Sequence, residues 1–491
     1  MAQPATFNFV IQPPDSINGE GSRNLLLAAD SLVVFGYSYI EGDEHYSSIF
    51  FDNSGNELSR NYFNPPFPMY AFRQEACTPT SSGFVVGSEV TQGDGYGWSA
   101  LMISLDQNMD TLWLSSFDAA NSAYTGFYKA KQIGDYYYGA GYVGDEYDGD
   151  GYADDNNMMI ACFSPDGEML WYEQVPAYVE YFGSVANDVF KINDEEYILV
   201  GRVINAHGFD PYTMVELNNI QFPILVKVNI TTDEFQVFPF ANLEFTNHLA
   251  STVELEEGDL MVCYGKTIGA TSQFSAAERP IAEIHIMRFD PSNFIVEYDN
   301  VLDTLYPYGL FNDFMRTSDG GFMITGKSSG QYLDDVWGLT NYPKGFFWKL
   351  DSLGNEEWFE EYFAPDPTPD DLYDQLYFWD VEECSDGGFA AVGDWYNNGL
   401  PSEHLTWLLK TDCKGKLEPP LLSLSAMIQQ NGDTLQVNST GAGVYDFSWD
   451  FGNGEVANVD SLTYVFTEPG EYLVIAIGTY CTIDIDTTFI V

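Results

Sequence analysis

The sequence predicts an all-β fold whose larger part is a seven-bladed β-propeller. A short apolar segment that ends on glycine recurs seven times, most clearly as Ser-Asp-Gly-Gly-Phe-Met-Ile-Thr-Gly at 318–326 and Ser-Asp-Gly-Gly-Phe-Ala-Ala-Val-Gly at 385–393. Strand-built repeats of this length are typical of propeller blades. The spacings are 51, 54, 60, 64, 61 and 67 residues, between the closing glycines Gly36, Gly87, Gly141, Gly201, Gly265, Gly326 and Gly393.

Each repeat continues with a second pair of strands. In the sixth repeat an apolar segment leads to Asp351, a turn with Gly354, and Trp358 seven residues after the aspartate. This order of strand, tight turn and strand predicts a β-hairpin. The same interval separates Asp106 from Trp113 and Ser164 from Trp171, and further copies of the turn are Asp52 with Gly55, Asp412 with Gly415, and the weaker Asn229 and Asp290.

A first strand precedes each closing glycine. It carries Asn187-Asp188, Asn312-Asp313 or Trp379-Asp380, with each aspartate 13 residues before its glycine. A repeat therefore contains four strands, as a propeller blade requires.

The two ends of the propeller are expected to meet in the last blade. The seventh repeat reaches Asp412 and then runs into Glu418-Pro419-Pro420, which is no strand. Residues 5–11 alternate in polarity and belong to no repeat, so we expect them to form the missing outer strand and remove an open edge. The propeller then spans residues 1–417, followed by a linker at 418–423.

Residues 424–491 differ in period and composition. They contain Trp-Asp-Phe-Gly-Asn-Gly at 449–454 and Pro-Gly-Glu-Tyr-Leu-Val at 469–474. These motifs resemble the polycystic-kidney-disease (PKD) domain, which implies an immunoglobulin-like β-sandwich. Asn453 and Tyr464 depart from the usual Asp and His. The repeats themselves resemble secreted bacterial propellers with Asp-Gly-Gly-Phe turns that precede PKD modules on type IX secretion cargo, which implies an extracellular or cell-surface protein.

Composition excludes several classes of partner. The chain has 18 Lys plus Arg against 74 Asp plus Glu, a formal net charge of -56. Nucleic acid is excluded because no basic surface exists to bind it, and anionic membranes are disfavoured. No stretch is long and apolar enough for membrane insertion. Because Met1-Ala2-Gln3-Pro4 leads straight into the first strand, we expect a mature or recombinant chain from which targeting segments have been removed.

The six cysteines show no metal-binding spacing. Cys162 and Cys263 lie in apolar strand patterns and are interpreted as small buried hydrophobic residues. Cys384 and Cys413 belong to one blade near turns on the same face. They form a disulfide or remain free thiols.

The sequence contains none of the common catalytic motifs that we considered. The five histidines have no His-Glu-x-x-His spacing, no Gly-x-Ser-x-Gly segment occurs, and carboxylates are so abundant that no particular pair stands out. The repeated Asp188, Asp313 and Asp380 have two interpretations. Their side chains bond the backbone of neighbouring turns, or they form a ring of acids that binds a cation or a sugar.

Aromatic residues make up 16% of the chain. One interpretation is that they pack between blades and in the sandwich core. The alternative is a set of sugar-stacking platforms in the variable loops. The candidates for that role are Tyr96, Trp98, Tyr147, Tyr152, Trp337 and Tyr342.

One loop has the composition of a calcium site. Between two strands of the third repeat, residues 146–157 place oxygen donors at loop positions one, three and five and glycine at position six. This spacing lets a short loop wrap a hard cation, and it resembles the loops of dockerin and thrombospondin type 3 repeats. The alternative is an acidic solvated loop. The expected ligands are Glu146, Asp148, Asp150, the carbonyl of Tyr152, Asp154, Asp155 and Asn157.

Three functions fit these features. The first is a secreted or cell-surface, calcium-stabilised, non-enzymatic binding or adhesion module for an extracellular glycan or protein. The second is a carbohydrate-active enzyme, a polysaccharide lyase or glycoside hydrolase on a propeller scaffold. The third is a structural subunit of an extracellular assembly, with self-association. A cluster of Arg, His, Tyr and carboxylate at one mouth of the channel favours the second, and scattered basic residues favour the first.

Overall fold

The structure is a computed structural model. The part of the chain that it describes comprises residues 5–14, 17–28, 31–40, 43–63, 77–91, 98–119, 122, 124–144, 156–176, 183–205, 220–239, 250–268, 281–305, 310–334, 338–365, 375–396, 404–418, 420–444, 446–481 and 483–491. Its regular elements are β-strands. None of the described segments is a helix of the length and apolarity that crossing a membrane requires.

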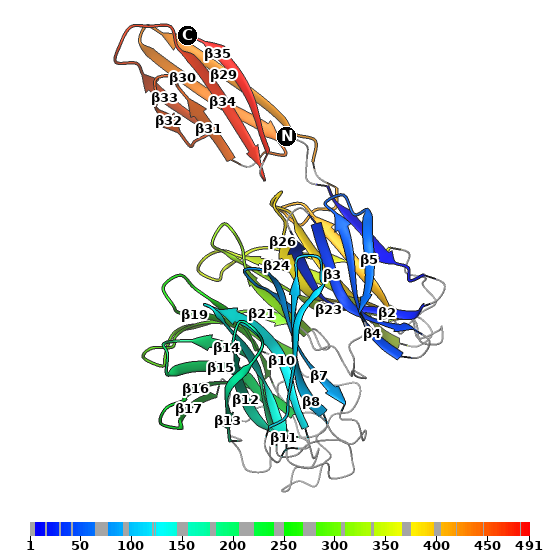
Figure 1. Ribbon diagram of the computed structural model, residues 1–491. Coiled ribbons are helices and arrows are strands. Elements are labelled where there is room, and N and C mark those ends of the chain that lie inside the picture. The colour runs from blue at the N-terminus through cyan, green and yellow to red at the C-terminus, as the bar shows by residue number, and fades with distance from the viewer. Residues whose placement is uncertain are drawn as a thin grey trace. The chain divides into compact units, whose positions relative to one another are not determined.

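By its internal contacts the chain divides into two compact units. The larger comprises Asn8–Glu382 and Ala391–Leu409, and the smaller comprises Met1–Phe7, Glu383–Ala390 and Lys410–Val491. The strands of each unit are described separately below (Figure 1).

The described strands before residue 412 form seven antiparallel sets of four. The first, fourth, fifth and sixth sets are separate sheets. Their strands are β2 (Ile17–Ala28), β3 (Ser31–Ile40), β4 (Asp43–Asp52) and β5 (Glu57–Phe63); β14 (Gly183–Lys191), β15 (Glu196–Asn205), β16 (Ile220–Asn229) and β17 (Glu234–Pro239); β18 (Ala250–Glu254), β19 (Leu260–Ile268), β20 (Ile281–Asp290) and β21 (Ile295–Leu305); and β22 (Leu310–Arg316), β23 (Phe322–Asp334), β24 (Gly338–Leu350) and β25 (Glu356–Tyr362).

The second and third sets share one eight-stranded sheet. Its two halves are joined by a single parallel pairing between Tyr124 and Trp98. The strands are β6 (Cys77–Pro79), β7 (Gly83–Thr91), β8 (Trp98–Asp106) and β9 (Thr111–Phe117), then β10 (Tyr124–Ile133), β11 (Tyr136–Gly144), β12 (Asn157–Phe163) and β13 (Met169–Val175).

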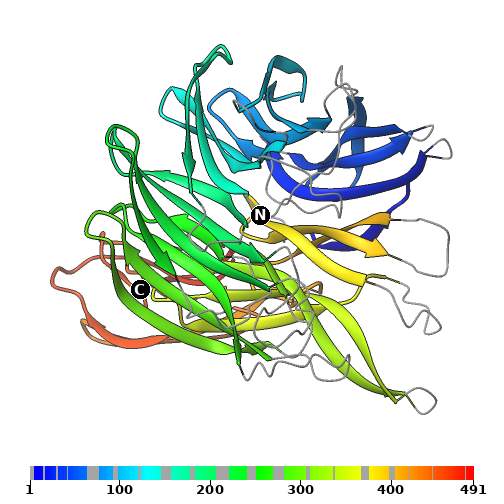
Figure 2. The same cartoon turned by 90° about the horizontal axis from the view of Figure 1, so that it is seen from below.

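The seventh set takes its outermost strand from the start of the chain. The order is β1 (Phe7–Ile11), β28 (His404–Thr411), β27 (Phe389–Tyr396) and β26 (Gln375–Glu383). Trp407 Nε1 donates to Asn8 Oδ1 at 2.7 Å, and Asn8 Nδ2 donates to the carbonyl of Phe363 at 2.8 Å. In Figure 2 the sets of the larger unit follow one another in sequence order, and the last lies beside the first.

In four of the repeats the closing glycine is required by a bulge in the first strand. The pairing of first and second strands shifts register directly after the residue opposite the glycine in the first, third, fourth and sixth sets. The bulge pushes a carbonyl of the first strand against the glycine. A Cβ on Gly141 would lie 1.9 Å from the carbonyl oxygen of Gly126, and one on Gly393 would lie 1.9 Å from that of Tyr377. Only glycine fits such a close approach.

The Asp-Gly-Gly turns are tied down by basic residues of the third strand. Lys349 Nζ lies 2.9 Å from Asp319 Oδ2, and Lys410 Nζ lies 2.7 Å from Asp386 Oδ2. Lys227 with Glu196 and Arg288 with Asp259 repeat the arrangement at 2.9 Å and 2.6 Å. In each case the lysine or arginine stands two residues before the residue that opens the turn between the third and fourth strands. Four of the 18 basic residues therefore serve the hairpins.

Aromatic and aliphatic side chains fill the spaces between neighbouring sets. One cluster joins Phe35 and Tyr46 of the first set to Phe84 and Ile103 of the second. Others join the third set to the fourth, the fourth to the fifth, and the fifth to the sixth. Many of the described aromatic residues therefore belong to the core between sets, as the first of their two interpretations holds.

The C-terminal strands form two facing sheets. One holds β29 (Ser423–Asn431), β30 (Thr434–Ala442) and β33 (Ser461–Val465), and the other holds β31 (Asp446–Asp450), β32 (Val456–Ala457), β34 (Leu473–Tyr480) and β35 (Ile483–Ile490). Trp449, fully buried, lies in their common core. The two departures from the PKD pattern contact each other, because Asn453 Nδ2 donates to the Tyr464 hydroxyl at 2.7 Å.

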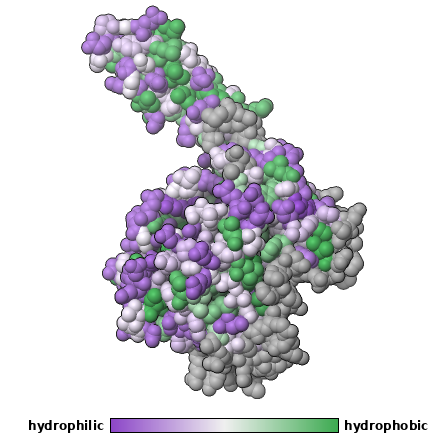
Figure 3. Space-filling model, in the orientation of Figure 1, coloured by the Kyte–Doolittle hydropathy of each residue, from purple (hydrophilic) through white to green (hydrophobic). Residues whose placement is uncertain are grey.

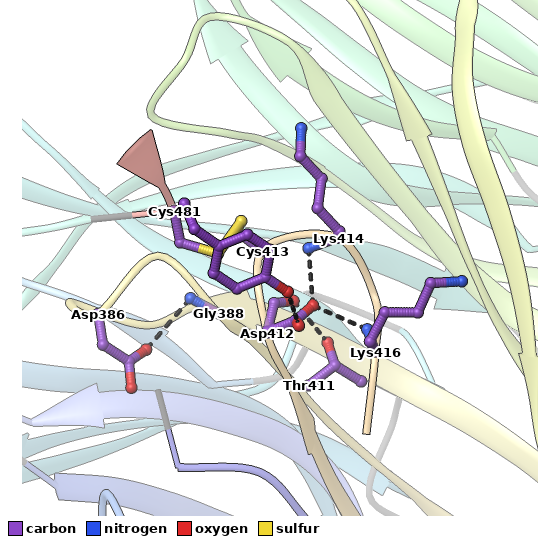
Figure 4. The surroundings of a disulfide bond; sticks show 9 residues. Asp386, Gly388, Thr411, Asp412, Cys413, Lys414, Lys416 and Cys481 are labelled. Carbon is purple, nitrogen blue, oxygen red and sulfur yellow. Dashed lines mark hydrogen bonds between the residues drawn. A yellow bond between two sulfur atoms is a disulfide. The ribbon is translucent and has the colours of Figure 1, made fainter. Parts of the chain in front are cut away.

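A disulfide in the smaller unit differs from the pairing considered from sequence. Cys413, just after β28, is bonded to Cys481, between β34 and β35 (Figure 4). Cys384 is buried and is not part of a disulfide, so the bridge between Cys384 and Cys413, one of the two alternatives left open by the sequence, is not formed. The adjacent Tyr480 donates its phenolic hydrogen to Asp412 Oδ2, while Asp412 Oδ1 accepts from the backbone nitrogens of Lys414 and Lys416.

Candidate functional site at the bulged strands

Each bulge adds one residue to the first strand of its set. The bulged residues are Arg23, Tyr128, Asn187 and Asn312, and Trp379 holds the same position in β26, two residues after the carbonyl that crowds Gly393. First strands of successive sets also touch, as β14 and β18 do. Bulges commonly re-aim side chains next to binding sites. These residues and those that follow the closing glycines are therefore the first place to look for function.

The most developed group joins the seventh set to the first. Arg23 stacks its guanidinium 3.9 Å from the ring centre of Trp379, and its Nη1 lies 2.8 Å from Asp394 Oδ2. Trp379 Nε1 donates to the same oxygen at 2.8 Å. Asp394 follows Gly393 and is only 1% exposed. We call Arg23, Tyr37, Tyr377, Trp379 and Asp394 the bulge cluster.

The rest of the bulge cluster is aromatic. Tyr377 meets the Trp379 ring edge-on at 4.8 Å, and Arg23 lies 5.7 Å from the ring centre of Tyr37. Burial, with the nearby charge of Asp394, raises the pKa of Tyr377 to about 12, so its phenol stays protonated in ordinary buffers. Lys327, which follows Gly326, places Nζ 5.9 Å from the Tyr377 ring.

The two carboxylate oxygens of Asp394 differ in their hydrogen bonds. Its Oδ2 accepts from both Arg23 and Trp379, whereas its buried Oδ1 has no hydrogen-bond donor among the residues that the structure describes. A buried carboxylate oxygen without a donor costs free energy, on the order of 1–3 kcal/mol. A hydroxyl group of a ligand is one donor that removes this cost.

A second group lies between the second, third and fourth sets. Tyr142, which follows Gly141, donates its hydroxyl hydrogen to Glu89 Oε2 at 2.6 Å, and Glu89 is 1% exposed. The bulged Tyr128 packs edge-on against Tyr142 at 5.8 Å. Arg202, which follows Gly201, lies 5.3 Å from the ring centre of Tyr128. Like the bulge cluster, this group combines an arginine, aromatic rings and a buried carboxylate.

The repeated aspartates bond backbone and basic groups. Asp380 accepts from the nitrogens of Val381 and Leu25 at 2.9 Å and 2.7 Å. Asp313 accepts from Phe314 N at 2.7 Å and from Val381 N, in the next set, at 3.3 Å. These side chains bond backbone nitrogens, as in the first of their two interpretations, but the nitrogens belong to strands and not to turns.

Asp188 differs in its second partner. Its Oδ1 accepts from Val189 N at 2.6 Å, and Lys131 and Lys129 of the preceding set lie 2.7 Å and 3.5 Å from its carboxylate. Burial raises the pKa of Asp188, and the two ammonium groups more than offset this, so the pKa is lowered overall.

The loop aromatics are only partly described. Tyr96, Tyr147, Tyr152 and Trp337 lie outside the described residues. Trp98 and Tyr342 were expected in loops and lie instead on strands. Trp98 begins β8 and meets Tyr124 edge-on at 5.6 Å, and Tyr342 pairs with Gly330 where β23 and β24 extend into a long hairpin.

The expected calcium loop lies almost wholly outside the described residues. Glu146, Asp148, Asp150, Tyr152, Asp154 and Asp155 all fall there, and Asn157 begins β12, where it pairs with Val143. Within the described ranges no group of three or more His, Cys, Asp or Glu side chains is arranged to hold a metal ion. The calcium site stays a prediction.

One histidine belongs to a polar network that was not predicted from the sequence. His285 Nδ1 lies 3.0 Å from Asp299 Oδ1 and 3.2 Å from the Tyr264 hydroxyl, which donates to Asp299 Oδ2 at 2.7 Å. Its Nε2 lies 3.4 Å from Glu283 Oε2. Burial and the Asp299 carboxylate raise the pKa of Tyr264.

The repeated aspartates stand out in the sequence more than the residues of the bulge cluster do, and the bulge cluster was not predicted. A signal was present, because the residue before Asp188 and before Asp313 is the bulged one, and Trp379 before Asp380 contacts Asp394, the residue after the closing glycine. What could not be read is the pairing of Arg23 with Asp394, which lie 371 residues apart.

We expect loss of the Asp394 carboxylate to destabilise the propeller. Asp394→Ala leaves Arg23 without its ionic partner and should lower the free energy of unfolding by about 3 kcal/mol, the cost of breaking a buried pair. Urea unfolding followed by fluorescence measures it. The double variant Arg23→Met/Asp394→Leu should recover most of the loss. Two losses that simply add would show that the pair is not coupled.

Comparison with known proteins identifies the C-terminal domain. Residues 422–478 match the family model of the PKD domain. A search among curated proteins finds no match to this chain.

Several solved structures resemble the chain. One is a protein of unknown function from Dyadobacter fermentans, with 9% identity, 82% of this chain and 97% of that chain covered, and a TM-score of 0.43. Polysaccharide lyase Uly1 has 8% identity, coverage of 83% and 92%, and a TM-score of 0.43. The GH93 alpha-L-arabinofuranosidase of Fusarium graminearum has 10% identity, coverage of 83% and 98%, and a TM-score of 0.39. Similarity this distant says nothing about activity.

Proposed function

We propose that this protein is an extracellular, non-enzymatic glycan-binding protein that holds its ligand at the bulge cluster. The observation that carries the proposal is the convergence of Arg23, Trp379 and Asp394 on inner strands of two neighbouring sets, with one Asp394 oxygen left to accept a hydrogen bond. Rings with a few placed polar groups are what ligand sites in proteins present. Sugar hydroxyls supply the missing donor.

The way the acids are used supports binding over catalysis. A general acid or base must exchange a proton with the substrate. Asp394 Oδ2 already holds Arg23 and Trp379, and Asp380 accepts from two backbone nitrogens. These carboxylates are positioned as fixed acceptors.

Two features support an extracellular location. The Cys413–Cys481 disulfide is of the kind that persists in oxidising compartments. The PKD match at 422–478 agrees with a surface-exposed module. The net charge of -56 favours calcium binding by the loop at 146–157, with a Kd on the order of 10⁻⁴ to 10⁻³ M, as in extracellular modules.

A glycan array followed by titration calorimetry tests the proposal. The parent should bind at least one glycan, and Trp379→Leu should weaken that binding at least ten-fold. Lys227→Ala is the control, because Lys227 pairs with Glu196 beside a tight turn, and it should bind as the parent does. Absence of binding to any glycan, or equal binding by Trp379→Leu, contradicts the proposal.

The second candidate is a carbohydrate-active enzyme, and the network of Tyr264, His285 and Asp299 favours it. A hydrogen-bonded phenol, imidazole and carboxylate are groups that move protons. Incubation with a panel of polysaccharides, read as reducing ends and unsaturated ends, tests this function. Turnover by the parent that disappears in His285→Gln would establish it and overturn the non-enzymatic proposal.

A further inference from the structure

The outer strands of four sets carry an aromatic residue at one fixed position. In each of these sets, the aromatic residue pairs with the third-strand residue that stands two positions before the first residue of the hairpin turn. In the second, third, fifth and sixth sets this residue is Trp113, Trp171, Tyr298 and Trp358. In the first set the same pairing joins Phe50 to Ser59.

Three of these aromatic rings contact the next set and fill the space between the two sets. Trp113 lies against the turn of the third set, where a Cβ on Gly167 would come within 2.6 Å of the ring, and it meets Tyr137 edge-on at 5.1 Å. Trp171 lies 5.6 Å from Tyr197 of the fourth set. Tyr298 donates to the carbonyl of Leu353, in a turn of the sixth set, at 3.5 Å.

The first set lacks this seal. Alternate residues of a strand share a face, and Ser59, Asn61 and Phe63 pair with Phe50, Ser48 and Tyr46. Phe50, Tyr46 and Phe63 belong to the core between the first and second sets, so Ser59 faces the second set. A hydroxymethyl group therefore stands where four other sets place a ring, and in the fourth set Gln236 takes that position.

A cavity opens at this interface. Its volume is about 630 Å³, inside the range of about 300–1,000 Å³ typical of small-molecule sites. The first set contributes Phe35, Tyr46, Ser47, Ser48, Arg60, Asn61, Tyr62 and Phe63, and the second contributes Val86, Ile103, Leu105, Asn108, Met109, Asp110 and Thr111.

The lining combines rings with hydrogen-bonding groups. Tyr46 stacks between Phe35 and Phe63, with ring centres 5.6 Å and 6.2 Å away. The amide of Asn61 and the carboxylate of Asp110 also line the cavity. Such a mixture suits a molecule with apolar ring faces and a rim of hydroxyls. Arg60 is already paired with Glu57, and the net charge of -56 repels anions.

We infer that this cavity, hereafter the Ser59 pocket, binds a short neutral oligosaccharide. The inference extends the proposed glycan-binding function to a second site on the first and second sets. The bulge cluster uses a cation and a buried acid, whereas the Ser59 pocket uses stacked rings, an amide and a carboxylate. The pocket therefore selects uncharged sugars. Ser59 does not itself line the cavity, but its neighbours Arg60 and Asn61 do, so an aromatic side chain at position 59 would stand at the edge of the pocket.

Filling the pocket tests the inference. Cellotetraose, xylotetraose, mannotetraose and laminaritetraose are the probes, measured by titration calorimetry on the full chain. The parent should bind at least one, and Ser59→Trp should weaken that binding at least ten-fold while leaving the melting temperature equal or higher, since it copies Trp113. Ser54→Trp, at an exposed turn position of the same set, is the matched control and should bind like the parent. Asn61→Ala, which opens no core, should weaken binding several-fold.

The outcomes separate the two proposals. If binding of a neutral tetrasaccharide is lost in Ser59→Trp but kept in Trp379→Leu, the pocket is a site separate from the bulge cluster. Neutral binding kept in Ser59→Trp overturns the pocket, and if Trp379→Leu then abolishes it, the bulge cluster stands. Binding of charged glycans alone also overturns the pocket and leaves the proposed function intact. No binding of any glycan overturns both.

Discussion

A variant that lacks residues 1–11 should melt at least 10 °C below the parent, or fail to fold. Removal of β1 deletes Phe9, which packs on Phe51 at 5.9 Å, and the buried Ile11. Burial of each such side chain contributes roughly 2 kcal/mol. The fully buried Trp407 loses the Asn8 oxygen that accepts from its indole nitrogen, at a cost of about 1–3 kcal/mol. The edge of β28 is also exposed.

Differential scanning calorimetry of two truncations measures this effect. Removal of residues 1–4 alone is the control and should leave the transition in place, because β1 begins at Phe7. A synthetic peptide of residues 1–13 added to the longer truncation should restore the melting temperature in a concentration-dependent way, as strand addition to an open edge does. An unchanged transition in the longer truncation would show that the last set does not depend on β1.

Replacement of both Cys413 and Cys481 by serine should destabilise the smaller unit by about 4 kcal/mol. The bond closes a loop between residues 68 apart, and the entropy of the unfolded chain is reduced accordingly. The pairing of Tyr480 with Asp412 should weaken in the same variant, because the disulfide holds the two neighbouring residues together.

Peptide mapping and calorimetry test this prediction together. A Cys413–Cys481 cross-linked peptide is expected in the parent, and reductant should lower the transition of the parent but not that of the double variant. Cys384→Ala is the control, because Cys384 is buried and in no disulfide, and this variant should respond to reductant like the parent. A cross-link between Cys384 and Cys413 would contradict the structure.

The repeats could be predicted from sequence because each is specified locally. At Gly141 and Gly393 a Cβ atom would lie 1.9 Å from a carbonyl oxygen of the first strand, so glycine is required there. The aspartate of each Asp-Gly-Gly turn pairs with a lysine of the same set. Both demands recur at a fixed distance along the chain. The order of strands in each set follows from the hairpins.

Contacts between distant residues could not be predicted in this way. Cys413 had a nearby candidate in Cys384, and nothing along the chain favours Cys481. Arg23 and Asp394 meet only because the first and last sets adjoin. The Ser59 pocket is an intermediate case. The seven-residue interval that ends at Trp113, Trp171 and Trp358 ends at Ser59 when it is counted from Asp52, so the missing ring was visible in the sequence.

Recovery of a bound glycan tests the central claim, that the propeller binds a sugar without changing it. The parent is incubated with an oligosaccharide that it binds on the array, and both bound and free sugar are analysed by mass spectrometry over time. We expect the sugar to be retained by the parent, released by Trp379→Leu, and of unchanged mass throughout. Shortened or unsaturated products that form with the parent and not with His285→Gln would contradict the account and make the protein an enzyme.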